Sequence, residues 1–200
     1  MPLTLDDVTW PLVTPRLEIR RAAAEDAAEV WAYRRLPAVA EWMIRLEDEL
    51  EPFTQRFVDP ERMGPTLVVH HDGRLVGDLM VRQEDVWAQH EVADLGRGAT
   101  AEIGWAFDPA VGGRGFATEA ARAAVRLCFE TLGLHRVSAI CFTDNTPSWR
   151  LMERLGMRRE AHAVGESLHR SGGWLDSYTY ALLRTEWDKA MRAEGMRARD

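Results

Sequence analysis

The stretch AEIGWAFDPAVGGRGFATEAARAAVRLCFETL, residues 101–132, predicts how the rest of the chain is organised. Its first segment, 101–107, is mostly apolar and alternating, which is typical of a strand, and Asp108-Pro109 ends it. A glycine-rich turn at 111–115 then leads into a strongly helix-forming segment. Such a turn presents unpaired N–H groups and the positive end of a helix dipole to one point, as a phosphate or pyrophosphate requires. The stretch therefore predicts an anion-binding cradle at the centre of the fold.

The helix predicted after this turn has one narrow apolar face made largely of small residues. Alanines on that face would let the helix lie close to a sheet, with charged residues on its other side. A second interpretation stays open, because short glycine patterns also occur in ordinary strand-to-helix connections. The residues of the apolar face are Ala117, Ala121, Ala124, Cys128 and Leu132.

Length and composition favour one domain, residues 1–200, in a reducing compartment. The chain has 200 residues, 46% hydrophobic and 28% charged, which suffices for one well-packed core and is short for two. Its two cysteines, Cys128 and Cys141, lie in apolar segments and indicate buried thiols rather than a disulfide framework. Neither a signal peptide nor an apolar run of about 20 residues is visible, so we expect a soluble, cytoplasmic protein that does not enter a membrane.

The charge balance disfavours nucleic acid as a partner. The net charge is −7 and the pI is near 5.4, whereas binding to a phosphate backbone needs clustered positive charge. An acidic surface would suit a cationic amine or a basic peptide. The acidic run 47–51 is interpreted as solvated surface, with attraction of a positively charged substrate as the alternative.

The remaining segments predict a mixed architecture of strands and helices. Asp72-Gly73 between two apolar runs is a strong hairpin signal. Thr146-Pro147 after a buried strand begins a helix, and Gly156 ends it. The predicted strands are 14–21, 66–70, 75–81, 136–142, 157–170 and 174–183, and the other predicted helices are 24–36, 39–46 and 186–191, the last followed by a charged tail.

Two motifs resemble those of a known family. GGRGFATEA at 112–120 and DNTPSWRLMERLGM at 144–157, joined by a helix and a strand, are similar to the GNAT superfamily of acyl-CoA-dependent N-acetyltransferases. TPRLEIRRAAAEDA at 14–27 and GGWLDSYTYALLRTEW at 172–187 resemble more narrowly the Rim-type branch of ribosomal-protein N-terminal acetyltransferases. The resemblance covers residues 14–187. It implies an α+β fold, the GNAT fold, with a mixed, mostly antiparallel twisted sheet of about seven strands flanked by helices.

The resemblance also implies where acetyl-CoA binds. The family's pyrophosphate motif is Gln/Arg-x-x-Gly-x-Gly/Ala, in which Gly115 matches the glycine and Ala117 matches the final small residue. Gly112 stands where Gln or Arg is usual, but backbone N–H groups do most of the holding and Arg114 would be available for a phosphate. No metal is implied. The coenzyme-binding residues expected in this motif are Gly112, Gly113, Arg114, Gly115, Phe116, Ala117 and Thr118.

The family's second motif implies two groups that handle the coenzyme's sulfur end. Asn145 matches the asparagine that orients the pantetheine arm. In many members a tyrosine protonates the departing CoA thiolate, but Met152 stands at that position, and Ser148 is expected to replace it as in the Rim-type branch. The alternative for Ser148 is a hydroxyl that only caps the helix. Backbone N–H groups near Ala106 and Phe107, where the family's strand parts from its neighbour, would hold the oxyanion.

A general base is needed because an amine must lose a proton before it attacks a thioester. A lysine-like amine with a pKa of about 10 needs more help than an α-amino group with a pKa of about 8. Glu102, at the start of the central strand, is the first candidate, acting directly or through water. Its alternative is an exposed strand carboxylate without a role. Glu160, His162 and Glu166 are weaker candidates.

Three functions are consistent with these residues. The favoured one is an N-acetyltransferase that moves the acetyl group of acetyl-CoA to a protein N-terminal α-amino group or a small-molecule amine. A larger donor such as succinyl-CoA would require a basic residue beside the acyl group. A non-catalytic acyl-CoA-binding sensor is the third, because the usual tyrosine is missing. A homodimer is plausible for this branch.

The sequence says least about the acceptor. The polar loop 83–99, with Trp87 and His90, is long enough to be functional and could form a substrate wall. Trp174 and Tyr178 in the final hairpin could stack on a substrate, or they could fill the hairpin face.

Overall fold

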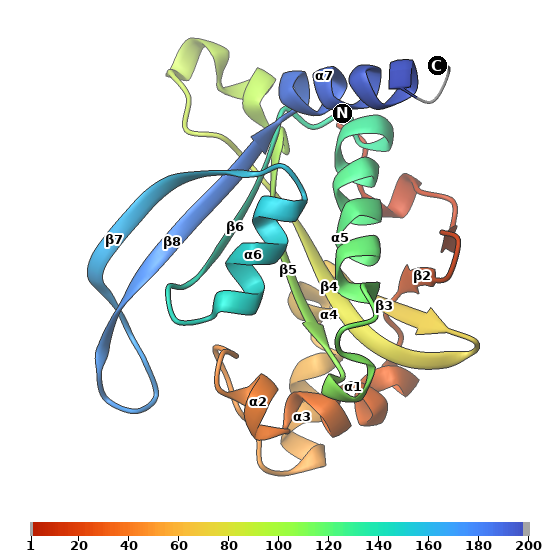
Figure 1. Ribbon diagram of the computed structural model, residues 1–200, viewed down its shortest axis with the longest axis vertical. Coiled ribbons are helices and arrows are strands. Elements are labelled where there is room, and N and C mark those ends of the chain that lie inside the picture. Colours follow the sequence, from red (N-terminus) through yellow and green to blue (C-terminus); the bar gives the residue numbers. More distant parts are fainter. Residues whose placement is uncertain (1, 198–200) are drawn as a thin grey trace.

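The alternating apolar segments pair into one sheet of eight strands in the computed structural model of the chain, which describes residues 2–197 (Figure 1). The strand order is β1-β2-β3-β4-β5-β6-β8-β7, and among the described strands only the neighbours β5 and β6 are parallel. The mostly antiparallel sheet expected from the sequence is confirmed, with a two-residue edge strand added to it. The bounds are Leu12–Val13 for β1, Glu18–Arg21 for β2, Thr66–His71 for β3, Arg74–Glu84 for β4, Thr100–Phe107 for β5, Arg136–Phe142 for β6, Arg158–Leu168 for β7 and Trp174–Leu183 for β8.

Strands β5 and β6 pair over only part of their length. Three residue pairs join them, from Thr100 with Arg136 to Glu102 with Ser138, whereas eight pairs join β4 and β5. Beyond Glu102 the register ends and the two strands separate. The sheet is therefore open near its centre, beside backbone groups of β5 that have no partner strand on that side.

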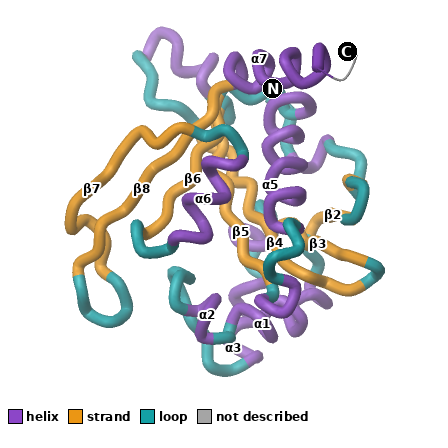
Figure 2. Tube along the Cα trace, in the orientation of Figure 1, coloured by secondary structure: helices purple, strands orange, loops and turns teal. Residues whose placement is uncertain are grey.

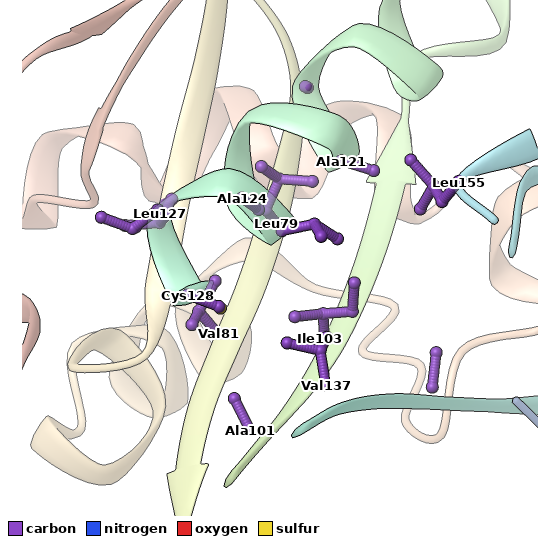
Figure 3. Packing of buried hydrophobic residues seen from close by; sticks show 14 of the residues in the cluster. Leu79, Val81, Ala101, Ile103, Ala121, Ala124, Leu127, Cys128, Val137 and Leu155 are labelled. Atoms are coloured by element: carbon purple, nitrogen blue, oxygen red, sulfur yellow. The ribbon is translucent and has the colours of Figure 1, made fainter. Parts of the chain in front are cut away.

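Two helices cover one face of the sheet at this opening (Figure 1). Helix α5 packs on β4 and β5 through Ala121 and Ala124, which are buried in the same cluster as Leu79 and Ile103 (Figure 3). Small side chains permit this close approach, as the alanine-rich face predicts. Helix α5 spans Phe116–Arg126 and continues as a π-helical turn at Leu127–Thr131, and α6 spans Thr146–Arg154.

Four short helices from the first third of the chain lie on the opposite face. Successive residues of a strand point to opposite faces, and Leu67 belongs to the cluster under α5 whereas Val68 packs with Val30 and Phe53 of the short helices. Each such apolar side chain stabilises the fold by roughly 1.5–3 kcal/mol when fully buried. The helices are α1 at Ala27–Arg34, α2 at Pro37–Ala40, α3 at Leu50–Phe57 and α4 at Pro60–Met63.

The predicted helix 39–46 is wrong in its extent, because α2 ends at Ala40. The chain then turns so that Trp42 packs against His169 of the β7–β8 turn, with 5.9 Å between the ring centroids. The carbonyl oxygen of Glu41 lies 3.0 Å from His169 Nε2 and is used in this contact rather than in another helical turn. Contacts with a distant hairpin override the local helical pattern here.

The loop 83–99 does not form the substrate wall that its length and composition predict. Strand β4 runs to Glu84, and the loop that follows lies beside α7, Arg184–Arg197, at the end of the molecule far from α1 to α3 (Figure 1, top). Trp87 is 95% exposed, and none of residues 85–99 lines the main cavity described below.

The end of the chain forms the predicted long hairpin. Strand β8 pairs with both β6 and β7, which leaves β7 as an edge strand that projects from the molecule (Figure 2). Helix α7 is longer than predicted, and its Trp187 is buried with its ring 6.0 Å from that of Phe129. Residues 198–200, the end of the predicted charged tail, lie outside the described residues. No helix within residues 2–197 is both long and apolar enough to span a membrane.

Candidate active site

A cavity of about 1350 Å³ lies where β5 and β6 part. Its lining comes from both faces of the sheet, because α5 and α6 contribute residues at one end and α1 to α3 contribute residues at the other. The fold therefore brings together motifs that are distant in the sequence. Ten of the predicted site residues besides Glu102 line it, namely Ala106, Phe107, Gly112, Gly113, Gly115, Phe116, Ala117, Thr118, Asn145 and Ser148.

The glycine-rich turn leads directly into the N-terminus of α5. Gly113 and Gly115 adopt φ angles of +74° and +80°, a left-handed backbone that residues with a Cβ disfavour. Gly115 is the N-cap residue, and it has no side chain to occupy the first amides of α5, which lack partners inside the helix. A Cβ placed at Gly113 would meet no atom within 4 Å, so the turn has open space beside it. The turn therefore fits a pyrophosphate group.

Arg114, expected to contact a phosphate, packs beside Phe116 and His71 in this structure. Its guanidinium lies 4.5 Å from the centroid of the Phe116 ring and 3.0 Å from His71 Nε2, and it does not line the cavity. Arg16 lines the cavity instead. The Arg16 Nη1 donates to the carbonyl oxygen of Arg114 at 2.8 Å, and Arg16 Nε donates to Glu119 of α5 at 2.7 Å. The sequence motif gave no signal for Arg16, because it comes from the start of the chain.

Asn145 and Ser148 both lie at the start of α6, but they have different roles there. Asn145 is the N-cap residue, and its Oδ1 accepts a hydrogen bond from the backbone N–H of Ser148 at 3.3 Å. The Ser148 hydroxyl is not used for capping and lies near the Cys141 thiol. Burial raises the pKa of Cys141 to about 11, although the Ser148 hydroxyl lowers it, so this thiol stays protonated at neutral pH. Met152, one turn later, is buried in the core and offers no proton to the cavity.

Glu102 lies at the last residue pair that joins β5 to β6 and lines the cavity. It faces Arg82 across the β4–β5 pair, with 3.7 Å between Glu102 Oε2 and Arg82 Nη1. Burial raises the pKa of Glu102, and this effect outweighs the positive charge of Arg82, which lowers it. A carboxylate with a raised pKa is a stronger base than an ordinary one. Glu102 can therefore accept a proton inside the cavity.

The other candidate bases are paired with neighbours and do not line the cavity. Glu160 accepts a hydrogen bond from Arg136 at 2.9 Å, and its pKa is lowered by that contact. His162 Nε2 lies 2.7 Å from a carboxylate oxygen of Asp176. Glu166 accepts a hydrogen bond from a serine of β8 at 2.6 Å.

The backbone of β5 beyond Glu102 directs the amides of alternate residues into the opening. Asp108 N–H donates to the carbonyl oxygen of Val76 at 3.0 Å. Antiparallel partners alternate between residues that exchange hydrogen bonds with each other and residues whose groups point to the other side. Ala106 is therefore expected to direct its amide toward β4, whereas Phe107 directs its amide into the gap. Of the two positions predicted to hold an oxyanion, Phe107 has the suitable direction.

The far wall of the cavity was not predicted from the sequence. Trp42 and Phe142 face each other there, with 6.1 Å between ring centroids. Beneath them Asp78, 1% exposed, accepts hydrogen bonds from Tyr33 and from Arg34, whose Nε lies 2.9 Å away. The one signal in the sequence was an acidic residue inside an apolar strand.

The sequence of the chain matches that of a known protein family. Residues 16–158 match the family model described as an acetyltransferase (GNAT) domain. The chain belongs to the GNAT acetyltransferase family. As a member of it, the protein is an acyl-CoA-dependent N-acetyltransferase. It is 28% identical over 180 residues to the uncharacterized N-acetyltransferase YnaD of Bacillus subtilis, a match that covers 88% of this chain and 99% of the relative.

Solved structures show the same GNAT fold. A GNAT-family acetyltransferase from Bacillus anthracis is 31% identical, with a TM-score of 0.74 and coverage of 88% of this chain and 100% of the other. RimJ of Mycobacterium smegmatis, in complex with CoA-disulfide, is 22% identical, with a TM-score of 0.69 and coverage of 85% and 83%. The likeness to RimJ concerns the fold, so placement of this GNAT protein in the Rim-type branch stays a prediction.

Proposed function

We propose that this GNAT enzyme transfers the acetyl group of acetyl-CoA directly to a primary amine, either a protein N-terminal α-amino group or a small-molecule amine. One observation carries the proposal. The opening between β5 and β6 joins the cradle at α5, the carboxylate of Glu102 and the hydroxyl of Ser148 in a single cavity. The complex of RimJ with CoA-disulfide supports coenzyme A as the carrier.

The residues of the cradle fit the donor. Gly113, Gly115 and the first amides of α5 would hold the pyrophosphate, and Asn145 would orient the pantetheine arm. When bound there, acetyl-CoA supplies an activated acetyl group as a thioester.

Side chains and backbone of the protein then accept and donate protons and stabilise the negative charge that develops on the carbonyl oxygen. Glu102 accepts a proton from the acceptor's ammonium, which frees the nitrogen lone pair to form the new C–N bond. The amide of Phe107 donates to the carbonyl oxygen where negative charge develops. Ser148 gives its proton to the sulfur as the C–S bond breaks and recovers one from the attacking nitrogen, which loses its second proton as the amide forms. Glu102 releases the proton that it accepted to solvent. The products are an amide and free CoA thiol.

A larger donor such as succinyl-CoA is a second candidate, because Arg82 lines the cavity beside Glu102 and could pair with a terminal carboxylate. A sensor without turnover is a third, because Met152 replaces the usual tyrosine. A homodimer and a cytoplasmic location stay predictions.

Calorimetric titration with acetyl-CoA, succinyl-CoA and CoA, followed by thiol release with a panel of amines and peptides, tests the proposal. Binding and turnover with acetyl-CoA support it, and faster turnover with succinyl-CoA favours the larger donor. Binding without turnover on any acceptor indicates the sensor. No binding of any of the three compounds overturns the coenzyme site.

A further inference from the structure

The side of the cavity formed by α1 to α4 and the middle strands carries more arginine than acid. Here the acceptor would enter, because the cradle for the donor lies at the other end. Six arginines line this side, against three acidic residues. They are Arg34, Arg35, Arg45, Arg56, Arg62 and Arg82, against Glu47, Asp78 and Glu102.

Each of the three acidic residues already has an arginine partner. An acid that is paired cannot neutralise a second guanidinium to the same extent. The pairs are Asp78 with Arg34, Glu47 with Arg56, and Glu102 with Arg82 at 3.7 Å.

The other three arginines have no acidic partner within the described residues. Arg35 lies over the ring of Trp31, 4.5 Å from its centroid. Arg45 and Arg62 make no ion pair with any residue of 2–193 whose side chain the structure describes. This wall therefore carries positive charge that the protein itself leaves unneutralised.

Arg62 and Arg82 line the same two cavities. Both line the main cavity, and both line a second cavity of about 760 Å³ that adjoins it at Ile44 and Pro65. Arg45 follows Ile44 in the chain and also lines the main cavity. The second cavity is also lined by two acidic residues, Asp6, which is paired with Arg21, and Glu61. Arg82 thus stands beside Glu102, and Arg45 and Arg62 line the same cavity.

From this arrangement we infer that the acceptor carries an anionic group, a carboxylate or a phosphate, in addition to its primary amine. The inference rests on the proposed function. Arg45 and Arg62 bind the anion, and Glu102, which is paired with Arg82, receives the ammonium at the opening. A polyamine would place further positive charge against the same wall, where like charges repel. The acceptor predicted from the overall acidic pI, a cationic amine or basic peptide, is thereby replaced by one of mixed charge.

Matched acceptors test the inference with the full-length enzyme and acetyl-CoA. The first set is 4-aminobutyrate, butylamine and 1,4-diaminobutane, which share one chain length and differ in the second group. The second set is 2-aminoethyl phosphate and ethanolamine, which separates a phosphate from a carboxylate preference. We expect kcat/KM to be about tenfold or more higher for an acceptor that carries an anionic group than for its partner without one, the factor that one charge-assisted hydrogen bond contributes.

Variants identify the arginines responsible. Arg45→Gln and Arg62→Gln should each lower the ratio of kcat/KM between the acceptor with an anionic group and its partner without one by about fivefold or more. Arg97→Gln is the matched control, because Arg97 is an exposed arginine paired with Asp94 and lines neither cavity. Its ratio should equal that of the parent enzyme.

The outcomes separate this inference from the proposed function. Equal values within each set, or preference for the diamine, overturn the anionic acceptor and leave acetyl transfer to amines intact. A preference for anions that survives both arginine variants overturns the assigned site. Failure to acetylate any amine overturns the proposed function, and the inference fails with it.

Discussion

Glu102 and Arg82 face each other across β5 and β4, with 3.7 Å between Glu102 Oε2 and Arg82 Nη1. At this distance the carboxylate lies in the field of the guanidinium but is beyond the range of a normal hydrogen bond. Arg82 therefore lowers the pKa of Glu102 only in part, and burial keeps that pKa above the ordinary value. The pair sets the pH at which Glu102 can accept a proton.

The kcat/KM of the enzyme should depend on pH through the ionisation of Glu102. A carboxylate base works in its ionised form, so kcat/KM falls as pH decreases through its pKa. Arg82→Gln removes the charge that lowers this pKa, so the acid limb of the kcat/KM profile should move to higher pH. The measurement uses butylamine, an acceptor without an anionic group, so that anion binding does not contribute. A limb that stays in place, while that of Arg97→Gln also stays, would contradict Glu102 as the titrating group.

Removal of the base itself should separate chemistry from binding. Glu102→Gln is expected to lower kcat by about 10²- to 10⁴-fold, because the ammonium then has no acceptor for its proton. Affinity for CoA, measured by calorimetry, should change little. Glu84→Gln is the matched control, since Glu84 lies near Glu102 on β4 but is exposed and outside the cavity. Similar rates for the two variants would exclude Glu102.

A pair of glycine variants tests the cradle. Gly115 and Gly156 have nearly the same backbone conformation, with φ angles of +80° and +82°. Alanine at either position should therefore destabilise the fold by about 1 kcal/mol. Only Gly115→Ala should also weaken CoA binding, because only Gly115 stands at the N-terminus of α5. Equal CoA affinities in the two variants would contradict the cradle.

Variants of Ser148 and Asn145 distinguish a catalytic role from helix capping. Ser148→Ala should slow turnover by about ten- to a thousandfold if its hydroxyl protonates sulfur, while Tm changes little because Asn145 still caps α6. Asn145→Ala should instead lose about 1 kcal/mol of stability. A Ser148→Ala enzyme with normal turnover would show that another group supplies the proton.

The pair of Asp78 and Arg34 in the wall of the cavity should dominate stability. Asp78→Asn leaves Arg34 partly buried without its counter-ion, and we expect a loss of about 3–5 kcal/mol in the free energy of unfolding, measured with urea. The double variant Asp78→Leu with Arg34→Met should recover part of that loss, because it removes both charges. A loss under about 1 kcal/mol in the single variant would mean that solvent already screens the pair.

Local signals predicted much of the fold. Asp72-Gly73 joins β3 and β4 as a hairpin, and β6 has the predicted bounds 136–142. These segments are determined by turn chemistry and by alternation, which act within a few residues. The segment 39–46 and the side chain of Arg114 were not predictable in this way, because contacts with distant residues decide their conformations.

The two ends of the candidate site also differ in how far local sequence signals predicted them. Its donor end comes from two short motifs, and the sequence therefore placed Gly115, Asn145 and Ser148 in one cavity that the structure also contains. Its acceptor end is formed by arginines that are scattered along the chain and meet only through the folding of α1 to α4. No spacing between Arg45, Arg62 and Arg82 could indicate this meeting.

The limited pairing of β5 with β6 has a kinetic consequence. Because the opening joins the two faces of the sheet, the donor can arrive along α5 and the acceptor from the side of α1 to α3. Neither has to leave before the other enters, so both substrates are bound together when the amide forms. Initial-rate plots should then intersect rather than run parallel, and a compound that occupies the acceptor end should not compete with the coenzyme.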